Sequence, residues 1–330
     1  MDSTYSLAVA IPTKNRPRDL ALTIGSVLGQ TAIPKQLIVI DQSVSDESRQ
    51  QVAELFRQQR PEVRTSLELS YVQDVSLSGL TAARNRALSV VHTKIILFLD
   101  DDVVLEPDFI EQIIAVFHDH PKATGVSGVV TNYSAPPTVT RWWSSLFMLS
   151  PFRDDRQPVY WNADGLRGKK PVQVTRLGGG LMAFRTAAIS GIAFDENLQG
   201  SCPGEDVEFC ARLRTDSVLL MTPNARLVHN HSPHGRSAEH WLSKHAWTMG
   251  YLYHRNWRHG VRNRFSFIWL NAGYILGAAL ATIRRSSLAP CRELARASRD
   301  SRRLAESASI ASSQARTGSF EARTERSIEG

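Results

Sequence analysis

The sequence lacks the cysteine patterns and the glycine-rich loops that mark several common classes of protein. Its 330 residues include 3 cysteines, Cys202, Cys210 and Cys291, and no two of them form a CxxC pair. An odd number without that spacing argues against a disulfide-stabilised fold and against a structural zinc site. Neither GxGxxG nor GxxxxGKS/T occurs. The sequence therefore supports neither a dinucleotide-binding Rossmann enzyme nor a P-loop nucleotide hydrolase.

Most of the chain also lacks a strong charge of one sign. The net charge is +7, but more than half of that excess falls in residues 284–330, which hold ten arginines and six acidic residues. The rest is not basic enough to be typical of a nucleic-acid binder, so we expect no nucleic-acid partner. At the N-terminus, acidic Asp2 precedes a short apolar run that ends near Pro12, which argues against a signal peptide. We therefore expect a cytoplasmic protein.

Short apolar runs alternate with helical patterns through the first 130 residues. This alternation is typical of βαβ units around a mainly parallel sheet, and a hydrophobic content of 42% can fill a sizeable core. Asn15 is a candidate N-cap for the first helix. The predicted strands are 7–12, 37–41, 67–72, 95–100 and 124–130. Two predicted helices start near Pro17 and Pro107, and two others cover 45–60 and 80–91.

The second half of the sequence is less regular. The stretch 131–176 shows no periodicity, and a loop of that length is usually functional. Order resumes with expected strands at 178–184, 218–221 and 226–231 and expected helices at 204–214 and 237–258. We predict an α/β domain over residues 1–232, a helical region over 233–303 and a loosely ordered tail over 304–330, because the tail has no apolar stripe.

Polar clusters follow four of the predicted strands, and the sharpest is Asp100, Asp101 and Asp102. Ligands of open α/β sheets collect at the carboxyl ends of the strands. Three adjacent carboxylates repel one another unless a cation relieves them, and alternation would point Asp100 and Asp102 the same way with Asp101 aside. The triplet therefore predicts a divalent metal site. A solvated, helix-capping acidic cluster ahead of Pro107 is the alternative.

Several short motifs follow one another along the chain. They are VAIPTKNR from Val9, DQS from Asp41, GL at Gly79, ARN from Ala83, FLDDD from Phe98, GGGLMAFR from Gly178 and GEDVE from Gly204. In this order they resemble family 2 glycosyltransferases with the GT-A fold, over roughly residues 5–235. The resemblance implies a Rossmann-like mixed sheet and an inverting transfer of sugar from a nucleotide-sugar donor to a hydroxyl of a saccharide or lipid-linked acceptor, as in polysaccharide or cell-envelope glycan synthesis. A noncatalytic carbohydrate-binding or scaffolding subunit is the alternative.

The resemblance also assigns roles to individual residues. Asp102 would ligate Mn²⁺ or Mg²⁺, which has physical sense because a hard cation stabilises a leaving diphosphate. His229 would be a second ligand, although a structural histidine is equally open, and alternation places His229 and His231 on one face. The implied donor contacts are Pro12, Thr13, Asn15, Arg16, Asp41, Asp74, Arg84, Asn85, Asp100 and Asp101.

Inverting transfer needs a base that takes the proton of the acceptor hydroxyl. Asp206 is the first candidate, because it begins a helix and shares a face with Phe209, Cys210 and Leu213. Glu205 is the second candidate. A simple preference of acidic residues for the positive end of a helix is the alternative.

Two further features concern partners. Trp142, Trp143 and Trp161 either stack on sugar rings or pack their own loop. The segment 265–283 is apolar apart from Asn271 and is bracketed by arginines, which fits a helix lying in a membrane interface at least as well as a span. We expect the protein to attach peripherally to an anionic membrane surface on the inner face of the cell membrane; a buried helix is the alternative.

Overall fold

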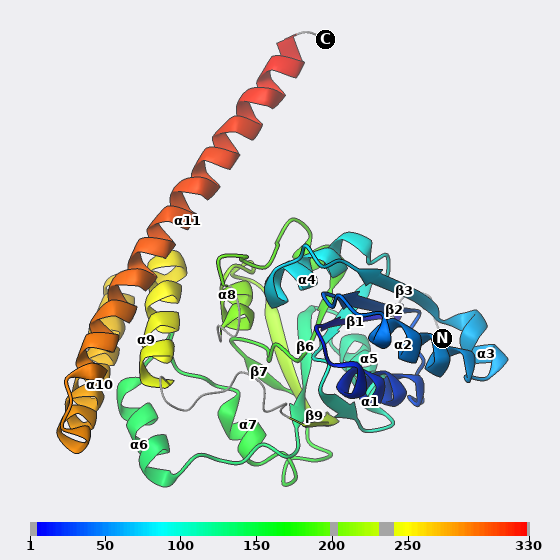
Figure 1. Ribbon diagram of the computed structural model, residues 1–330, viewed down its shortest axis with the longest axis horizontal. Coiled ribbons are helices and arrows are strands. Elements are labelled where there is room, and N and C mark those ends of the chain that lie inside the picture. Colours follow the sequence, from blue (N-terminus) through cyan, green and yellow to red (C-terminus); the bar gives the residue numbers. More distant parts are fainter. Residues whose placement is uncertain (1–4, 199–203, 231–240, 329–330) are drawn as a thin grey trace. The chain divides into compact units, whose positions relative to one another are not determined.

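The computed structural model describes residues 5–198, 204–230 and 241–328. The chain forms two units (Figure 1). The α/β unit comprises Met1–Ala135 with Asp154–Gly235, and the helical unit comprises Pro136–Arg153 with Arg236–Gly330. The predicted boundary after residue 232 thus lies close to the second division of the chain. Sequence reasoning did not predict that 136–153 leaves the first unit.

The α/β unit is built on a mixed sheet of nine strands within the described residues. The order is β3-β2-β1-β4-β8-β6-β9-β5, with β7 paired to β9. The strands β3, β2, β1 and β4 run parallel, and β8 joins antiparallel to both β4 and β6. The strands are β1 (Leu7–Thr13), β2 (Gln36–Asp41), β3 (Glu68–Gln73), β4 (Ile95–Leu99), β5 (Val103–Leu105), β6 (Ala123–Val130), β7 (Val172–Val174), β8 (Leu181–Arg185) and β9 (Val218–His229).

Helices cover both faces of this sheet, which explains why its central strands are continuous apolar runs. All residues of β1 are buried, and alternate side chains enter two separate cores. One core is closed by α1 (Pro17–Leu28), α2 (Glu47–Arg57) and α5 (Phe109–Asp119), and the other by α4 (Gly79–Val90) and α8 (Glu205–Ala211). The shorter helices are α3 (Pro61–Ser66), α7 (Gln157–Trp161) and the 3₁₀ turn Thr186–Ile189.

Three local expectations were wrong. Arg16, not Asn15, is the N-cap of α1, and Asn15 has φ +56°, a left-handed conformation that asparagine tolerates well. The strands expected at 218–221 and 226–231 form one strand, β9, whose pairing with β6 absorbs register shifts. The stretch 131–176 contains α6 (Thr138–Phe147), α7 and β7, because packing rather than periodicity orders these short elements.

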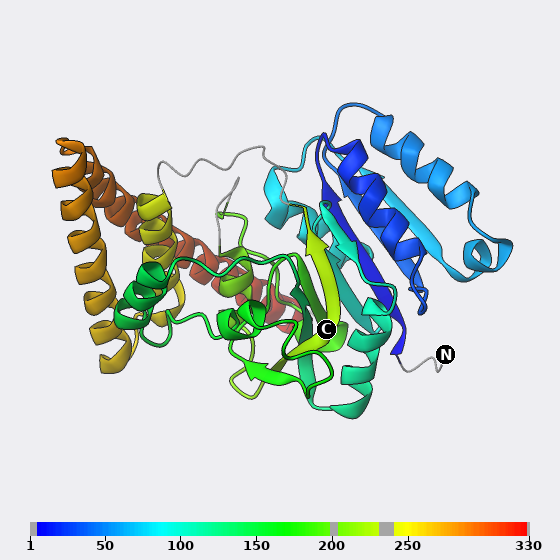
Figure 2. The same cartoon turned by 90° about the horizontal axis from the view of Figure 1, so that it is seen from below.

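The helical unit contains α6, α9 (Trp241–Leu252), a π-helical turn (Tyr253–Trp257), α10 (Val261–Arg285) and α11 (Ala289–Ile328) (Figure 2). Its interior is aromatic: the rings of Tyr253 and Phe267 stack with centroids 3.9 Å apart, and Phe152 packs against both. The helix α11 runs through residues where the sequence predicts a loosely ordered tail. Alanine, arginine and glutamate favour the helix there without an apolar stripe.

Candidate active site

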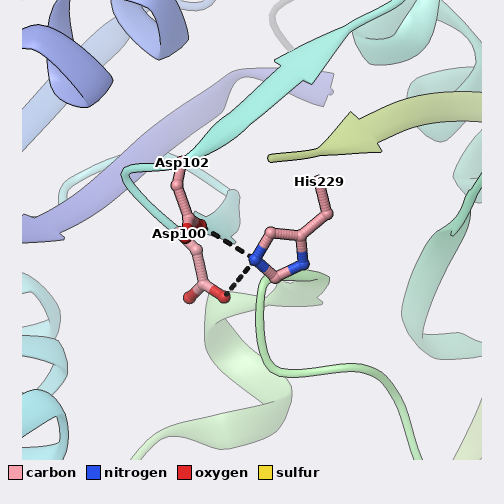
Figure 3. A group of neighbouring side chains, drawn as sticks. All are labelled: Asp100, Asp102 and His229. Carbon is pink, nitrogen blue, oxygen red and sulfur yellow. Dashed lines mark ion pairs between the residues drawn. The ribbon is translucent and has the colours of Figure 1, made fainter. Parts of the chain in front are cut away.

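The candidate metal ligands meet at the turn between β4 and β5. Asp100 follows β4, Asp102 precedes β5, and antiparallel pairing of β5 with β9 places Val103 opposite His229. The Nε2 atom of His229 lies 2.8 Å from a carboxylate oxygen of Asp102 and 3.9 Å from one of Asp100 (Figure 3). One ligand atom from each residue lies within 4.8 Å of the others. Two carboxylates and an imidazole at this spacing suit a divalent cation such as Mn²⁺ or Mg²⁺.

Neighbouring backbone and side chains hold the imidazole in place. The amide of His229 donates to Asn132 Oδ1 (3.0 Å), and Asn132 Nδ2 donates to the carbonyl of His229 (2.9 Å). The amide of Asn230 donates to the carbonyl of Asp102 (2.8 Å). These contacts fix the end of β9 against the acidic turn. His231 and His234 lie outside the described residues.

Asp101 points away from this cluster, as the alternation predicts. Its carboxylate accepts hydrogen bonds from Thr13 Oγ1 (2.7 Å) and from a guanidinium nitrogen of Arg16 (3.0 Å). Burial raises the pKa of Asp101 to about 6, helped by the charge of Asp102 and opposed by Thr13 and Arg16. Arg16 also lies 3.7 Å from Asp102. The first loop is therefore tied to the acidic turn through Asp101, and Pro12 precedes that loop inside buried β1.

The ends of β1, β2 and β3 form a second polar group. Asp41 is fully buried, and its carboxylate accepts from the amide of Ser43 (2.8 Å) and from the Tyr71 hydroxyl (2.6 Å). Burial, followed by this hydrogen bond, raises the pKa of Tyr71. The amide of Asn15 donates to Ser43 Oγ (2.7 Å). The first two strand ends are thus hydrogen-bonded together beside Asp41.

Asp74 follows β3 at the same edge of the sheet. Its amide donates to the carbonyl of Asp41 (2.8 Å). Its side chain accepts from the amide and hydroxyl of Ser76, and these bonds hold the pKa of Asp74 below its ordinary value. Asp74 therefore lies next to Asp41, with its carboxylate in a local turn.

Arg84 is a completely buried arginine at the centre of the site. Its guanidinium donates to the carbonyl of Gly179 (2.7 Å), lies 3.1 Å from Glu205 Oε1 and lies 3.3 Å from Asp100 Oδ1. A buried charge needs such partners, because desolvation without them is costly. Arg84 thereby connects the acidic turn to the start of α8. Arg84 is therefore part of a buried charge network and not of a surface salt bridge.

Asn85 has a different environment from Arg84. Its amide group donates to the carbonyl of Phe194 (3.0 Å) and to Glu196 (2.8 Å), and its oxygen accepts from the amide of Phe194 (2.7 Å). The structure therefore places Asn85 against the segment 194–196, away from the carboxylates that surround Arg84.

The three glycines 178–180 make room for side chains of the site. A Cβ atom at Gly179 would lie 2.8 Å from Glu205 Oε1, and one at Gly178 would lie 2.6 Å from the Tyr160 hydroxyl. A Cβ atom at Gly180 would overlap the carboxylate of Asp100. The absence of side chains at these positions therefore leaves room for Tyr160, Glu205 and Asp100.

Glu205 and Asp206 begin α8 but have separate partners. Glu205 pairs with Arg84, whereas Asp206 Oδ2 accepts from Arg156 (2.8 Å) and from the amide of Gly179 (3.2 Å). Burial, and then the neighbouring Asp206, raise the pKa of Glu205 to about 7 against the opposing charge of Arg84. Gly179 is bonded to both networks, because its amide donates to Asp206 and its carbonyl accepts from Arg84, the partner of Glu205.

Arg156 is a site residue that the sequence did not reveal. Its guanidinium donates to Asp206, to the carbonyl of Leu177 (2.6 Å) and to both carboxylate oxygens of Asp154 (2.9 and 3.0 Å). Burial works to lower its pKa, but Asp206 and Asp154 raise the pKa of Arg156 well above its ordinary value. The signal in the sequence was indirect, because Arg156 and Asp154 both lie in the aperiodic stretch 131–176 that was predicted to be functional.

The three tryptophans of that stretch do not share one environment. Trp142 and Trp143 lie on α6 in the helical unit, whereas Trp161 ends α7 in the α/β unit. The ring of Trp143 packs against Phe147, with centroids 4.9 Å apart. Packing within its own segment is the correct interpretation for Trp143.

Comparison with known proteins assigns the family. Residues 8–189, more than half of the chain, match the family described as glycosyl transferase family 2, and the chain belongs to that family. Its fold is that of TarS 1–349 from S. aureus, solved in complex with UDP-GlcNAc: the TM-score is 0.58 at 16% identity, over 91% of this chain and 81% of that one. The mannosyltransferase PcManGT from Pyrobaculum calidifontis, solved with GDP-Man and Mn²⁺, gives a TM-score of 0.54 at 16% identity, over 94% and 88%.

These structures confirm the expected GT-A-like α/β fold with a helical C-terminal region. Among curated proteins, the glucosyl-dolichyl phosphate glucuronosyltransferase of Haloferax volcanii is 24% identical over 131 residues, which cover 38% of this chain and 37% of that one. The chain spans about a third of the length of the curated relatives it matches.

Proposed function

We propose that the protein transfers a sugar from a nucleoside-diphosphate donor, with inversion, to a hydroxyl of a saccharide or lipid-linked acceptor. The observation that carries this proposal is the meeting of Asp100, Asp102 and His229 at the strand ends, with Arg84 linking them to Glu205. Membership of the family and similarity to structures that hold UDP-GlcNAc or GDP-Man support it.

The donor would bind along the strand ends that the polar contacts connect. The loop of Thr13, Asn15 and Arg16 would flank the base and ribose together with Asp41. This loop contacts Asp101 directly and is connected to Asp41 through Ser43. Asp41 is fully buried and partnered, so its role is to shape the floor of this site. Asp74 extends the same edge.

We propose a cation site at the acidic turn, because its side chains supply ligand atoms that suit a divalent cation. Asp102 and His229 would ligate Mn²⁺ or Mg²⁺, with Asp100 as a direct ligand or through water. When bound, the cation would neutralise charge on the departing diphosphate. Arg84 holds Asp100 and the Gly179 carbonyl, so the chain itself orients the acidic turn.

The proton of the acceptor hydroxyl goes to a carboxylate at the start of α8. We propose Asp206 as this base and Glu205 as the second candidate. The Gly179 amide and Arg156 fix the carboxylate of Asp206, which favours it as the positioned group. Each carboxylate has an arginine neighbour, so that neighbour does not separate the two candidates. The pKa of Glu205 near 7 suits a base at neutral pH, which favours Glu205.

A noncatalytic carbohydrate-binding or scaffolding role is the second candidate. The ion pairs of Asp206 with Arg156 and of Glu205 with Arg84 favour it, because both carboxylates are partnered within the protein. Such a protein would bind a sugar nucleotide or glycan without turnover.

One experiment tests both roles. Wild-type protein is titrated calorimetrically with UDP- and GDP-sugars in the presence of Mn²⁺, Mg²⁺ or EDTA, and release of nucleoside diphosphate is followed in parallel. We expect metal-dependent binding and slow donor hydrolysis. Asp119→Asn, an exposed acid at the end of α5, is the matched control for Asp102→Asn. Binding without turnover with any donor and acceptor supports the noncatalytic role, and no binding refutes both.

The acceptor and the location belong to the same proposal. Among the described residues, α10 is the one helix long and apolar enough to cross a membrane, and 28% of its apolar window is buried. We propose that 265–283 attaches the protein peripherally to the inner face of the cell membrane, where a lipid-linked acceptor for envelope glycan synthesis is available. The dolichyl phosphate in the name of the Haloferax volcanii relative supports a lipid-linked acceptor.

A further inference from the structure

The helical unit contains a basic groove that the proposed transfer reaction does not use. It encloses about 620 Å³ between α9, α10, α11 and the π-helical turn. Gly250 and the buried side chain of Ser301 form its floor, and Phe267 and Asn271 of α10 form one wall. The groove therefore has a buried serine hydroxyl at its base, which donates to the carbonyl of Ser298 (3.0 Å), and an aromatic ring at its side.

Three arginines of α11 line the opposite wall: Arg299, Arg302 and Arg303. Arg302 pairs with Glu306 at 2.9 Å, and Glu306 is the single acid lining the groove. Among the described side chains, no ion pair is formed by the guanidinium groups of Arg299 and Arg303. The groove thus presents an excess of hydrogen-bond donors with positive charge, which suits the oxygens of a phosphate group.

The helix α10 is apolar on the side that faces solvent. Its outward residues fall within a stripe of about 140° at 100° per residue, whereas its buried residues are Ser266, Leu270, Gly273, Tyr274 and Ala278. An ordinary surface helix exposes charged and polar residues, but α10 exposes apolar ones. The exposed apolar stripe consists of Val261, Phe265, Ile268, Trp269, Ile275, Leu276, Leu280 and Ile283.

The groove borders this stripe. Asn271, which lines the groove, lies one turn of helix from both Ile268 and Ile275, which are 69% and 63% exposed. The stripe also continues onto α6. Trp269 Nε1 donates to the carbonyl of Leu146 (2.8 Å), and Leu146 follows exposed Trp142 at helical spacing. A phosphate in the groove would therefore have an apolar surface beside it.

We propose that this groove binds the phosphate group of an anionic membrane lipid while the stripe on α10 and α6 enters the apolar edge of the leaflet. The proposal deepens the membrane attachment proposed above and rests on it. Charge complementarity selects the occupant, since α10 carries arginines at both ends and no acidic residue along its length. The phosphate of one lipid would bind in the groove, and the acyl chains of the same lipid would lie against the stripe.

Vesicle flotation with the full-length protein tests the proposal. Vesicles of phosphatidylcholine are compared with vesicles in which about one lipid in five is phosphatidylglycerol. The variant Arg299→Gln/Arg303→Gln removes two charges from the groove. Its matched control, Arg292→Gln/Arg296→Gln, removes two exposed charges from the same helix outside the groove. We expect the groove variant to lose about tenfold in affinity for anionic vesicles and the control to lose less than about threefold.

Each outcome decides a separate point. An equal loss of vesicle affinity in both variants overturns specific binding in the groove and leaves only diffuse electrostatic attraction. Absence of vesicle binding by the wild type overturns both attachment and groove, whereas the transfer proposal stands or falls on sugar-nucleotide binding. Stabilisation against heat by inorganic phosphate without vesicle binding identifies a soluble phosphate ligand, and a dimer that Ile268→Asp dissociates identifies a second copy as the partner; either result overturns the lipid.

Discussion

The two units of this protein differ in where their apolar and charged residues lie. In the α/β unit, the central strands are buried throughout and the charged groups meet inside the site, where Arg84 has no exposed side-chain surface. In the helical unit, Ile268 and Ile283 are 69% and 76% exposed, and arginines line an open groove. The first arrangement suits reactive groups held in one geometry, and the second suits a partner that supplies the missing apolar contacts.

The largest expected effect concerns the acidic turn. Asp102→Ala should lower sugar transfer by about three orders of magnitude or more and abolish metal-dependent donor binding, because a carboxylate ligand is lost. Turnover and calorimetric titration with Mn²⁺ measure the effect, with Asp119→Ala as control. Full activity of wild-type protein in EDTA would show that the acidic turn has a structural role only. The charged groups buried in the α/β unit would then no longer differ in function from the arginines of the helical unit.

The two carboxylates of α8 give the next effect. Asp206→Asn should lower kcat by about 10²-fold or more with the donor Kd nearly unchanged, as expected for loss of a general base. Glu205→Gln should lower kcat less. Single-turnover kinetics with saturating donor separates the two variants. A wild-type rate in Asp206→Asn, together with a large loss in Glu205→Gln, would transfer the base role to Glu205.

Arg156 is expected to affect stability as well as rate. Arg156→Gln leaves Asp154 and Asp206 buried without their cation, which should cost about 3 kcal/mol of unfolding free energy. Arg167→Gln, at an exposed ion pair with Glu106, is the control and should change stability by less than about 1 kcal/mol. Urea denaturation measures both. If Arg156 positions the base, Arg156→Lys restores folding but leaves kcat low with KM unchanged.

The raised pKa of Glu205 predicts a specific dependence on pH. Its pKa rises from the ordinary value of 4.5 to about 7 on folding, so the folded state binds more protons between these values. This group therefore stabilises the protein below about pH 4.5 relative to neutral pH, and that contribution is lost as the pH rises through about 7. We expect Glu205→Gln to gain about 1–3 kcal/mol relative to wild type between pH 5 and pH 8. A constant difference across this range would contradict the burial argument.

The smallest expected effect on stability is that of Ile275→Ser, and a core variant with a large effect makes the contrast between the two units measurable. Leu97→Ala, in a fully buried strand, should cost about 2–5 kcal/mol of unfolding free energy. Ile275→Ser, on the outward side of α10, should cost less than about 0.5 kcal/mol and instead weaken vesicle binding. Chemical denaturation of both variants decides the point. A large loss of stability in Ile275→Ser would mean that the stripe is a core surface.

Sequence reasoning worked best where local pattern and final packing agree. The strands β1 to β4 and β6 were predicted to within one or two residues. For β1, β2 and β4 the reason is that a strand buried on both faces needs a continuous apolar run. Adjacent aspartates after such a strand repel one another, which led to the prediction of a metal site there, and the structure brings Asp100 and Asp102 together with His229. The irregular stretch could not be predicted in the same way, because Arg156 acquires its role from Asp154 and Asp206, and Asp206 lies 50 residues away.

The family, the sheet and the acidic turn follow from the amino-acid sequence, since short-range periodicity and motif order carry that information. Three other properties became visible only in the folded chain: Glu205 and Asp206 have different arginine partners, the glycines 178–180 accommodate Asp100 and Glu205, and the apolar residues of α10 face outward. These properties depend on which distant segments pack together. Periodicity shows that a helix has an apolar side, but only its neighbours determine which side is covered.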